Sequence, residues 1–303
     1  IADDALTTTF AAMRKPVVIA PAMNDKMYES PAIQQAIGIL STWENITMLD
    51  CADGALACGT SGKGRMQEVD VIKNAIEYAL TPKTLQGKNI LITAGPTHEA
   101  IDPVRYISNA STGKMGLALT KSCLKRGANV TLVLGPTHLS TQSWQAIAPL
   151  TIIPVVSSSE MCEQTVSAFQ HADISILCAA VADFTPTTAA KQKIKKEPGQ
   201  TSMTLELQTT TDIAATLGKQ KRADQTLVGF ALETHNELTN AQRKMQSKNL
   251  DMIVLNSLQD PGAGFGVDTN KVTLLYPDGS QKKLPLISKE EVADAIIEAI
   301  NPS

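Results

Sequence analysis

Short apolar runs alternate with longer amphipathic segments along most of this chain. Runs bounded by turn residues are typical of buried strands, and apolar residues recurring roughly every three or four positions are typical of helices. This alternation predicts an α/β fold with a doubly wound, Rossmann-like parallel sheet. After residue 88 we expect strands at 90–93, 129–134, 174–177, 227–230 and 252–255, and helices at 114–126, 159–170, 212–221, 236–248 and 289–300.

The first 80 residues form a separate pattern. They predict strands at 16–20 and 47–49, a glycine-rich segment at 54–64, and helices at the start, at 31–40 and at 69–80. The polar stretch "TPKTLQGK" then carries Pro82 and Gly87, which favour a break. We therefore expect one α/β domain over 1–80, a linker over 81–88 and a second domain over 89–303, with a hairpin near Pro277-Asp278-Gly279.

Composition narrows the class of protein. With 43% hydrophobic residues, 303 residues can form two cores. The formal net charge of −3 gives no field that would attract nucleic acid or a membrane, and no apolar run is long enough to span a bilayer. Five cysteines without a CxxC pair suggest reduced thiols. These features predict a cytoplasmic protein.

The loop after the strand at 90–93 is the most unusual segment. It extends to residue 116, far beyond the usual length of such connections. Its "TGKM" looks like part of a P-loop, but Ser108 stands where that motif needs glycine, and Met115 where it needs Ser or Thr. This loop is therefore not a Walker A motif.

The same loop nevertheless has the composition of an anion site. Its end precedes a helix, whose free N–H groups attract negative charge. Simple N-capping is the alternative for an isolated Ser-Thr-Gly. The length and polarity of the loop favour anion binding, and its candidate residues are Arg105, Asn109, Ser111, Thr112, Gly113 and Lys114.

Three further segments follow predicted strands or lie near them. In "CAAVADFTP", Asp183 is suited to hold Mg²⁺ or a ribose hydroxyl, or simply to cap a turn. In "KQKIKKE", alternation would place Lys191, Lys193 and Lys195 on one edge facing a polyphosphate, although lysine runs are usually solvated. Lys244 and Lys248 share a helix face, and Phe230 follows a strand where it would stack on a base or belong to the core.

Two motifs mark the first domain. "PAMN" places Asn24 just after a buried strand, where an amide would orient a carboxylate or form a turn. "GALACGTSGKGRM" surrounds Cys58 with glycines, as in a mobile flap or an ordinary surface loop. Neither motif identifies a reaction by itself.

Together these motifs resemble one family, the bifunctional coenzyme A biosynthesis flavoproteins, in which phosphopantothenoylcysteine decarboxylase is fused to phosphopantothenate–cysteine ligase. The ligase half is similar from about Leu85 onward, through "ITAGPTHEAIDPVRYISNASTGKMG", "AAVADF", "KIKK", "GFALET" and the paired lysines. The first 80 residues look like the C-terminal part of a flavodoxin-like decarboxylase domain.

The resemblance implies a reaction in two steps. The carboxylate of 4'-phosphopantothenate would be activated by CTP, giving an acyl-cytidylate and pyrophosphate, and the amine of L-cysteine would then release CMP. It implies that Asn109 acts at the acyl-cytidylate and Lys193 during its formation. The implied nucleotide site comprises Leu177, Cys178, Ala179, Asp183, Lys193, Thr211, Asp212, Ile213, Ala214, Phe230, Lys244 and Lys248, with Mg²⁺ at Asp183.

The resemblance also bears on the first domain. There Asn24 would contact the substrate carboxylate and Cys58 would supply a proton. Family decarboxylases bind FMN through an N-terminal segment and use a histidine, whereas this sequence has no histidine before His98. We therefore expect that the sequence begins inside a longer natural chain, and that these 303 residues alone do not decarboxylate.

Several alternatives remain open. The chain could be a non-catalytic, scaffolding member of the same family. An NAD-dependent dehydrogenase fits the sheet, but no GxGxxG follows a predicted strand. The residues do not decide between CTP and ATP. The resemblance implies a homodimer through the ligase half, and a higher oligomer if the flavoprotein domain is complete.

Overall fold

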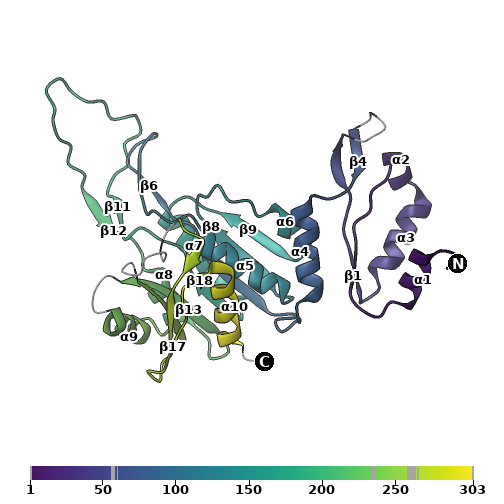
Figure 1. Ribbon diagram of the computed structural model, residues 1–303. Coiled ribbons are helices and arrows are strands. Elements are labelled where there is room, and N and C mark those ends of the chain that lie inside the picture. The colour runs from purple at the N-terminus through teal and green to yellow at the C-terminus, as the bar shows by residue number, and fades with distance from the viewer. Residues whose placement is uncertain are drawn as a thin grey trace. The chain divides into compact units, whose positions relative to one another are not determined.

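The computed structural model describes residues 2–55, 59, 61–233, 237–257, 264 and 266–301. The chain divides into two compact units (Figure 1). The first unit comprises residues 1–82 and 142–148, and the second comprises 83–141 and 149–303. None of the described helices combines the length and the apolarity that a membrane span requires.

The first unit is small. Strands β1 (Val17–Ile19) and β2 (Ile46–Met48) are parallel, and β3 (Ala52–Ala55) and β4 (Ser61–Arg65) form an antiparallel pair. Leu49, Val71 and Ala75 form its buried core. Its helices are α1 (Ala5–Ala12), α2 (Asp25–Tyr28), α3 (Pro31–Ser41), α4 (Val69–Leu80) and α6 (Gln142–Gln145). Helix α6 was not expected here, because it lies far from the others in sequence.

An eight-stranded sheet forms the centre of the second unit, in the order β17-β16-β14-β13-β10-β5-β8-β9. The run from β9 to β14 is parallel, β16 is antiparallel to β14, and β17 is antiparallel to β16. The parallel strands are β5 (Asn89–Ala94), β8 (Asn129–Leu134), β9 (Leu150–Pro154), β10 (Ile174–Leu177), β13 (Thr226–Glu233) and β14 (Met252–Ser257). In chain order these strands are arranged 3-2-1-4-5-6, the doubly wound order. The predicted fold class is confirmed.

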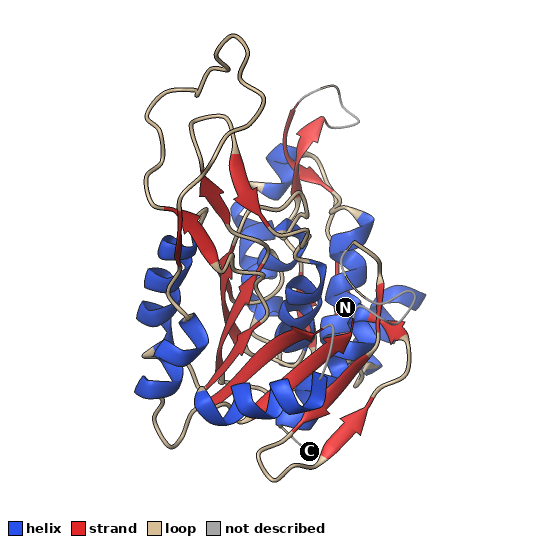
Figure 2. Cartoon of the chain, turned by 90° about the vertical axis from the view of Figure 1, so that its left-hand side faces the viewer, coloured by secondary structure: helices blue, strands red, loops and turns tan. Residues whose placement is uncertain are grey.

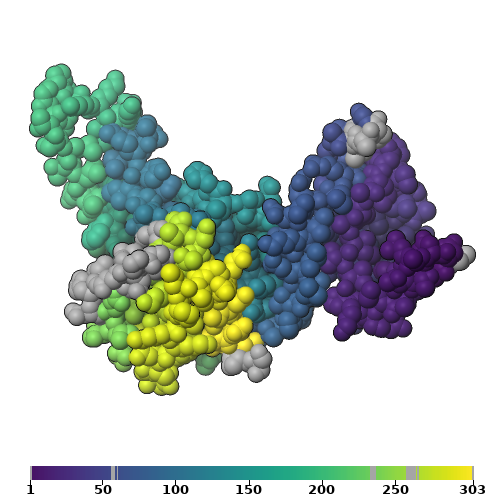
Figure 3. Space-filling model, in the orientation of Figure 1, coloured from purple at the N-terminus to yellow at the C-terminus, as the bar shows by residue number. Residues whose placement is uncertain are grey.

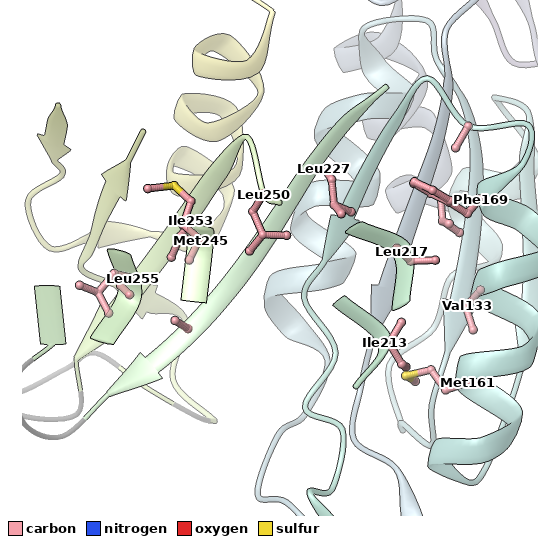
Figure 4. Close-up of a cluster of buried hydrophobic side chains, with 14 of the residues drawn as sticks. Val133, Met161, Phe169, Ile213, Leu217, Leu227, Met245, Leu250, Ile253 and Leu255 are labelled. Carbon is pink, nitrogen blue, oxygen red and sulfur yellow. The ribbon is translucent and has the colours of Figure 1, made fainter. Parts of the chain in front are cut away.

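Helices cover both faces of this sheet (Figure 2). Helices α7 (Ser158–Phe169), α8 (Ile213–Gln220) and α9 (Glu237–Ser247) share one apolar core with the strands, in which Phe169, Leu217 and Met245 are buried (Figure 4). Helix α5 (Lys114–Lys125) packs against β5, β8 and α10 (Lys289–Ile300). The hairpin expected at Pro277–Gly279 joins β16 (Val272–Leu275) and β17 (Gln281–Lys283).

Strand β9 and the β3–β4 pair were not predicted, and neither were three small antiparallel ribbons of the second unit. Strands β6 (His98–Ala100) and β7 (Tyr106–Ser108) pair within the segment expected to be one long loop. Strands β11 (Phe184–Pro186) and β12 (Leu207–Thr209) pair at the base of a long excursion, and β15 (Thr269–Asn270) pairs with β18 (Ile287–Ser288). Strands this short carry too few residues to show a period of two.

Candidate active site

The strand order of the second unit reverses between β5 and β10, which are direct neighbours in the sheet. The loop that leaves β10 is hydrogen-bonded to the end of β5 and to the loop that follows β5. The N–H of Ala180 donates to the carbonyl of Gly95 at 2.9 Å, and the N–H of Ala179 donates to Oγ1 of Thr93 at 3.2 Å. Such a switch point is where open α/β sheets bind ligands.

A cleft of about 630 Å³ opens at this point. Its volume is typical of sites that enclose a ligand the size of a nucleotide. The catalytic candidate Asn109 lines it. So do most residues of the expected nucleotide site, although the sequence separates them widely: Leu177, Ala179, Asp183, Thr211, Asp212, Ile213, Ala214, Phe230, Lys244 and Lys248.

Asn109 connects the two switch-point loops. Its Nδ2 donates to the carbonyls of Ala180 and Val181, at 3.0 and 3.2 Å. A side-chain amide has two N–H donors, so both are engaged here. Donation from Asn109 to an acyl oxygen would therefore require one of these bonds to be exchanged.

The far side of the cleft carries the paired lysines. Lys248 follows the last turn of α9, and its N–H still donates to the carbonyl of Lys244 at 3.0 Å, so the helical spacing between them is kept. Nζ of Lys248 lies 2.8 Å from Oδ2 of Asp212. Burial raises the pKa of this carboxyl, but the hydrogen bond and charge of Lys248, together with backbone N–H donors at the start of α8, outweigh burial and lower the pKa. Asp212 also caps α8 by accepting from the N–H of Ala215 at 2.9 Å.

A smaller cavity of about 150 Å³ adjoins the cleft and shares Ala179, Ala180 and Phe230 with it. It is lined by the end of the long loop, Ser111, Thr112, Gly113 and Lys114, together with Cys178. Gly113 precedes α5 with a φ of 82°, a left-handed conformation that favours glycine. Burial raises the pKa of the Cys178 thiol to about 12, which keeps this thiol protonated at neutral pH.

Sequence reasoning missed three polar residues of this smaller cavity, Asn256, Asn270 and Lys289. Asn256 lies at the carboxyl end of β14, and its buried Oδ1 has no hydrogen-bond partner among the described residues. Its place directly after a buried apolar run was a usable signal. Lys289 begins α10, and its Nζ donates to the carbonyls of Gly264 and Thr269 at 3.2 and 3.0 Å. No local pattern distinguishes this buried lysine from a surface one.

Arg105 and Lys193 were expected to contact substrate and nucleotide. Neither of them is among the described residues that line the cleft or the smaller cavity. The segment 191–196 is not a strand, and Lys191, Lys193 and Lys195 are all exposed. Arg105 instead forms an ion pair with the fully buried carboxylate of Asp102.

In the first unit, the two decarboxylase-like motifs lie together. The N–H of Met23 donates to the carbonyl of Gly64 at 2.9 Å, and a Cβ on Gly64 would lie 2.3 Å from the carbonyl oxygen of Met23. The side chain of Asn24 caps α2 by accepting from the N–H of Lys26. Cys58 lies outside the described residues.

Asp183 was also expected to bind a metal ion. The described residues contain no group of three or more His, Cys, Asp or Glu side chains that would hold an ion by themselves. Mg²⁺ in nucleotide sites needs fewer protein ligands, because it keeps several waters and is bound by one or two carboxylates together with the substrate phosphates. Asp183 in the cleft fits that role.

These features define a class of protein: an α/β nucleotide-binding type of fold with cationic and amide groups at its switch point, joined to a second α/β unit. Comparison with known proteins identifies the family. Residues 85–302 match the DNA/pantothenate metabolism flavoprotein C-terminal domain, and residues 1–81 match the flavoprotein family.

Curated relatives agree with this assignment. The chain is 46% identical over 303 residues to the coenzyme A biosynthesis bifunctional protein CoaBC of Bacillus subtilis (strain 168), covering 99% of this chain and 73% of the relative. It is 48% identical over 305 residues to a cysteine/cysteine sulfinic acid decarboxylase of an unknown prokaryotic organism, covering 99% of this chain and 83% of the relative.

A solved structure gives the same result. The crystal structure of the C-terminal domain of a coenzyme A biosynthesis bifunctional protein CoaBC is 41% identical in sequence and matches this chain with a TM-score of 0.60. The match covers 72% of this chain and 96% of the chain in that crystal structure. The chain therefore belongs to the DNA/pantothenate metabolism flavoprotein family, together with the bifunctional proteins of coenzyme A biosynthesis.

Proposed function

We propose that the second unit is a CTP-dependent phosphopantothenate–cysteine ligase. The observation that carries the proposal is the meeting of Asn109, Phe230 and Lys248 in one cleft of about 630 Å³ at the switch point. In the first step a carboxylate oxygen of 4'-phosphopantothenate attacks the α-phosphorus of CTP, and pyrophosphate leaves. In the second step the amine of cysteine attacks the acyl carbon, and CMP leaves.

Each step places negative charge where this unit has donors and cations. Lys244 and Lys248 line the cleft near the expected triphosphate, and Phe230 offers a ring face to the base. Preorganised donors and charges of this kind stabilise the transition state more than the ground state. Mg²⁺, held at Asp183, would supply charge neutralisation on the phosphates. Asn109 would donate to the acyl oxygen after exchanging one of its bonds to the β10 loop.

The deciding measurement is pyrophosphate release from CTP with phosphopantothenate. We expect release by the wild type and a loss of at least about a hundredfold in Lys193→Ala, if that lysine stabilises developing charge. The matched control is Lys191→Ala, because Lys191 is an equally exposed lysine of the same segment. In Asn109→Ala, pyrophosphate release should continue while cysteine fails to release CMP.

The same assay tests the alternatives. ATP in place of CTP tests the choice of base. Absence of release with any nucleotide would contradict the ligase and leave a scaffolding protein. Release of CO₂ from cysteine alone would instead favour an activity like that in the name of the decarboxylase relative. We expect none from these 303 residues, which have no histidine before His98.

A further inference from the structure

A long arm leaves the second unit between β11 and β12. It comprises residues 187–206 and stands out from the surface of that unit (Figures 1 and 3). Its base is closed by a bond from the N–H of Thr187 to the carbonyl of Glu206 at 3.0 Å. The arm carries the lysine run, and all four of its lysines are exposed: Lys191, Lys193, Lys195 and Lys196.

One buried carboxylate fastens the middle of this arm. Asp102, whose side chain is 0% exposed, accepts through Oδ1 from the N–H groups of Val104 and Arg105, both at 2.9 Å. Its Oδ2 accepts from Nε of Arg105 and from the N–H of Ile194, both at 3.0 Å. Nη2 of Arg105 in turn donates to the carbonyl of Ile194 at 2.9 Å.

Both backbone groups of Ile194 are thus held by one ion pair, which we call the Asp102–Arg105 clasp. A further hydrogen bond connects the arm to the same loop: the N–H of Ala190 donates to the carbonyl of Ile101 at 2.9 Å. The guanidinium of Arg105 holds the pKa of the Asp102 carboxyl well below its usual range. The carboxylate therefore stays charged across the physiological range, and charge-assisted bonds of this kind are the strong ones.

We propose that Asp102 is a positioning residue for the lysine arm. Ile194 lies between Lys193 and Lys195, so fixing both of its backbone groups restricts where the two ammonium groups can reach. Arg105, expected to contact substrate, acts here as the second half of the clasp. This inference rests on the proposed function for the role of Lys193, but the clasp itself can be tested without any activity.

The first test is limited trypsin digestion of the full chain, with cleavage sites identified by mass spectrometry. In Asp102→Asn an amide N–H would face the donors that the carboxylate now satisfies. We expect the rate of cleavage after the arm lysines to rise at least about tenfold. The loss of one hydrogen bond to a charged group changes an equilibrium by about this factor.

Glu99→Gln is the matched control. Glu99 is also a buried carboxylate of the same segment, but it accepts from the N–H and Oγ of Ser158, at 2.8 and 3.1 Å, and thus ties β6 to α7 instead of to the arm. Arm cleavage at the wild-type rate in Asp102→Asn, or equal acceleration in Glu99→Gln, would overturn the clasp.

The second test is a double-mutant cycle on pyrophosphate release. If Asp102 acts through Lys193, Asp102→Asn should lower kcat about tenfold or more with little change in KM for CTP, and should have no further effect in the Lys193→Ala background. Additive losses would overturn the positioning role. If even the wild type releases no pyrophosphate, the proposed function fails, whereas the digestion still decides whether the clasp holds the arm.

Discussion

At the scale of single residues, Arg105 and Lys248 are both engaged in ion pairs within the protein. The sequence predicted ligand contacts for both, from the type of residue and its place in a long loop or on a helix. Arg105 pairs with Asp102, three residues before it in the same loop, whereas the pairing of Lys248 with Asp212 is set by the fold. A triphosphate in the cleft must therefore compete with the carboxylate of Asp212 for Lys248, which makes nucleotide binding there an exchange of anions.

Lys83 gives a prediction of pH dependence. Its Nζ donates to the carbonyl of Lys125, and burial lowers its pKa from 10.5 to about 8. Between pH 8 and 10.5 the unfolded chain holds a proton that the folded chain has released, so this lysine makes stability rise with pH over that window. We expect the free energy of unfolding of the wild type, relative to Lys83→Met, to increase between pH 8 and 10 in urea titrations. Parallel pH profiles would contradict the lowered pKa.

At the scale of elements, the approach of α8 to the end of α9 sets one side of the cleft. A Cβ on Gly218 of α8 would lie 1.9 Å from the carbonyl oxygen of Lys248. Nδ2 of Asn249 also donates to the carbonyl of Gly218 at 3.0 Å. The glycine thereby allows the helix that Asp212 caps to meet the turn that carries Lys248.

Gly218→Ala should therefore disturb both stability and binding. We expect it to destabilise the chain by about 1–3 kcal/mol through overpacking, and to weaken CTP binding by moving Lys248, as measured by calorimetric titration. Gly38→Ala is the control, since Gly38 lies in helix α3 with no atom within 4 Å of an added Cβ. It should leave binding unchanged and stabilise by up to about 1 kcal/mol. Equal effects of the two substitutions would argue against the contact.

At the scale of the whole molecule, the two units differ in the size of their cores. The first has Leu49, Val71 and Ala75 buried together, whereas the second buries apolar side chains along most of an eight-stranded sheet. A core that small stabilises a unit only weakly, because the buried apolar area scales with size. The two units should therefore unfold separately.

Differential scanning calorimetry tests this expectation. We expect two unfolding transitions, one for each unit. Leu49→Ala should lower the temperature of only the transition of the first unit, since removing a buried Leu side chain destabilises by about 2–5 kcal/mol. CTP with Mg²⁺ should raise the temperature of only the transition of the second unit. At a ligand concentration of 100 times Kd, binding adds about 2.7 kcal/mol to the free energy of unfolding of that unit. NADH serves as the control nucleotide. A single transition shifted by both treatments would contradict independent units.

Much of the lining of the cleft was predictable because its signals are local. Ala179, Asp183 and Phe230 follow or end apolar runs, and the carboxyl ends of parallel strands meet at one edge of a sheet whatever the strand order. Asn256 could have been found by the same rule. The short ribbons could not, because strands of two or three residues carry too little periodicity.

By itself, the sequence determined the alternation of strands and helices, the parallel sheet and the loops that surround the cleft, because propensity and hydrophobic period depend on neighbouring residues. The tertiary structure alone decided the order of the strands, the joining of residues 142–148 to the first unit, and the pairing of charged side chains that are far apart in the chain. Lys248 and Arg105 show the physical reason: Lys248 pairs with Asp212 at the start of another helix, and Arg105 reaches the carbonyl of Ile194 in a distant segment. Contacts between segments far apart in the chain are recorded by no local pattern.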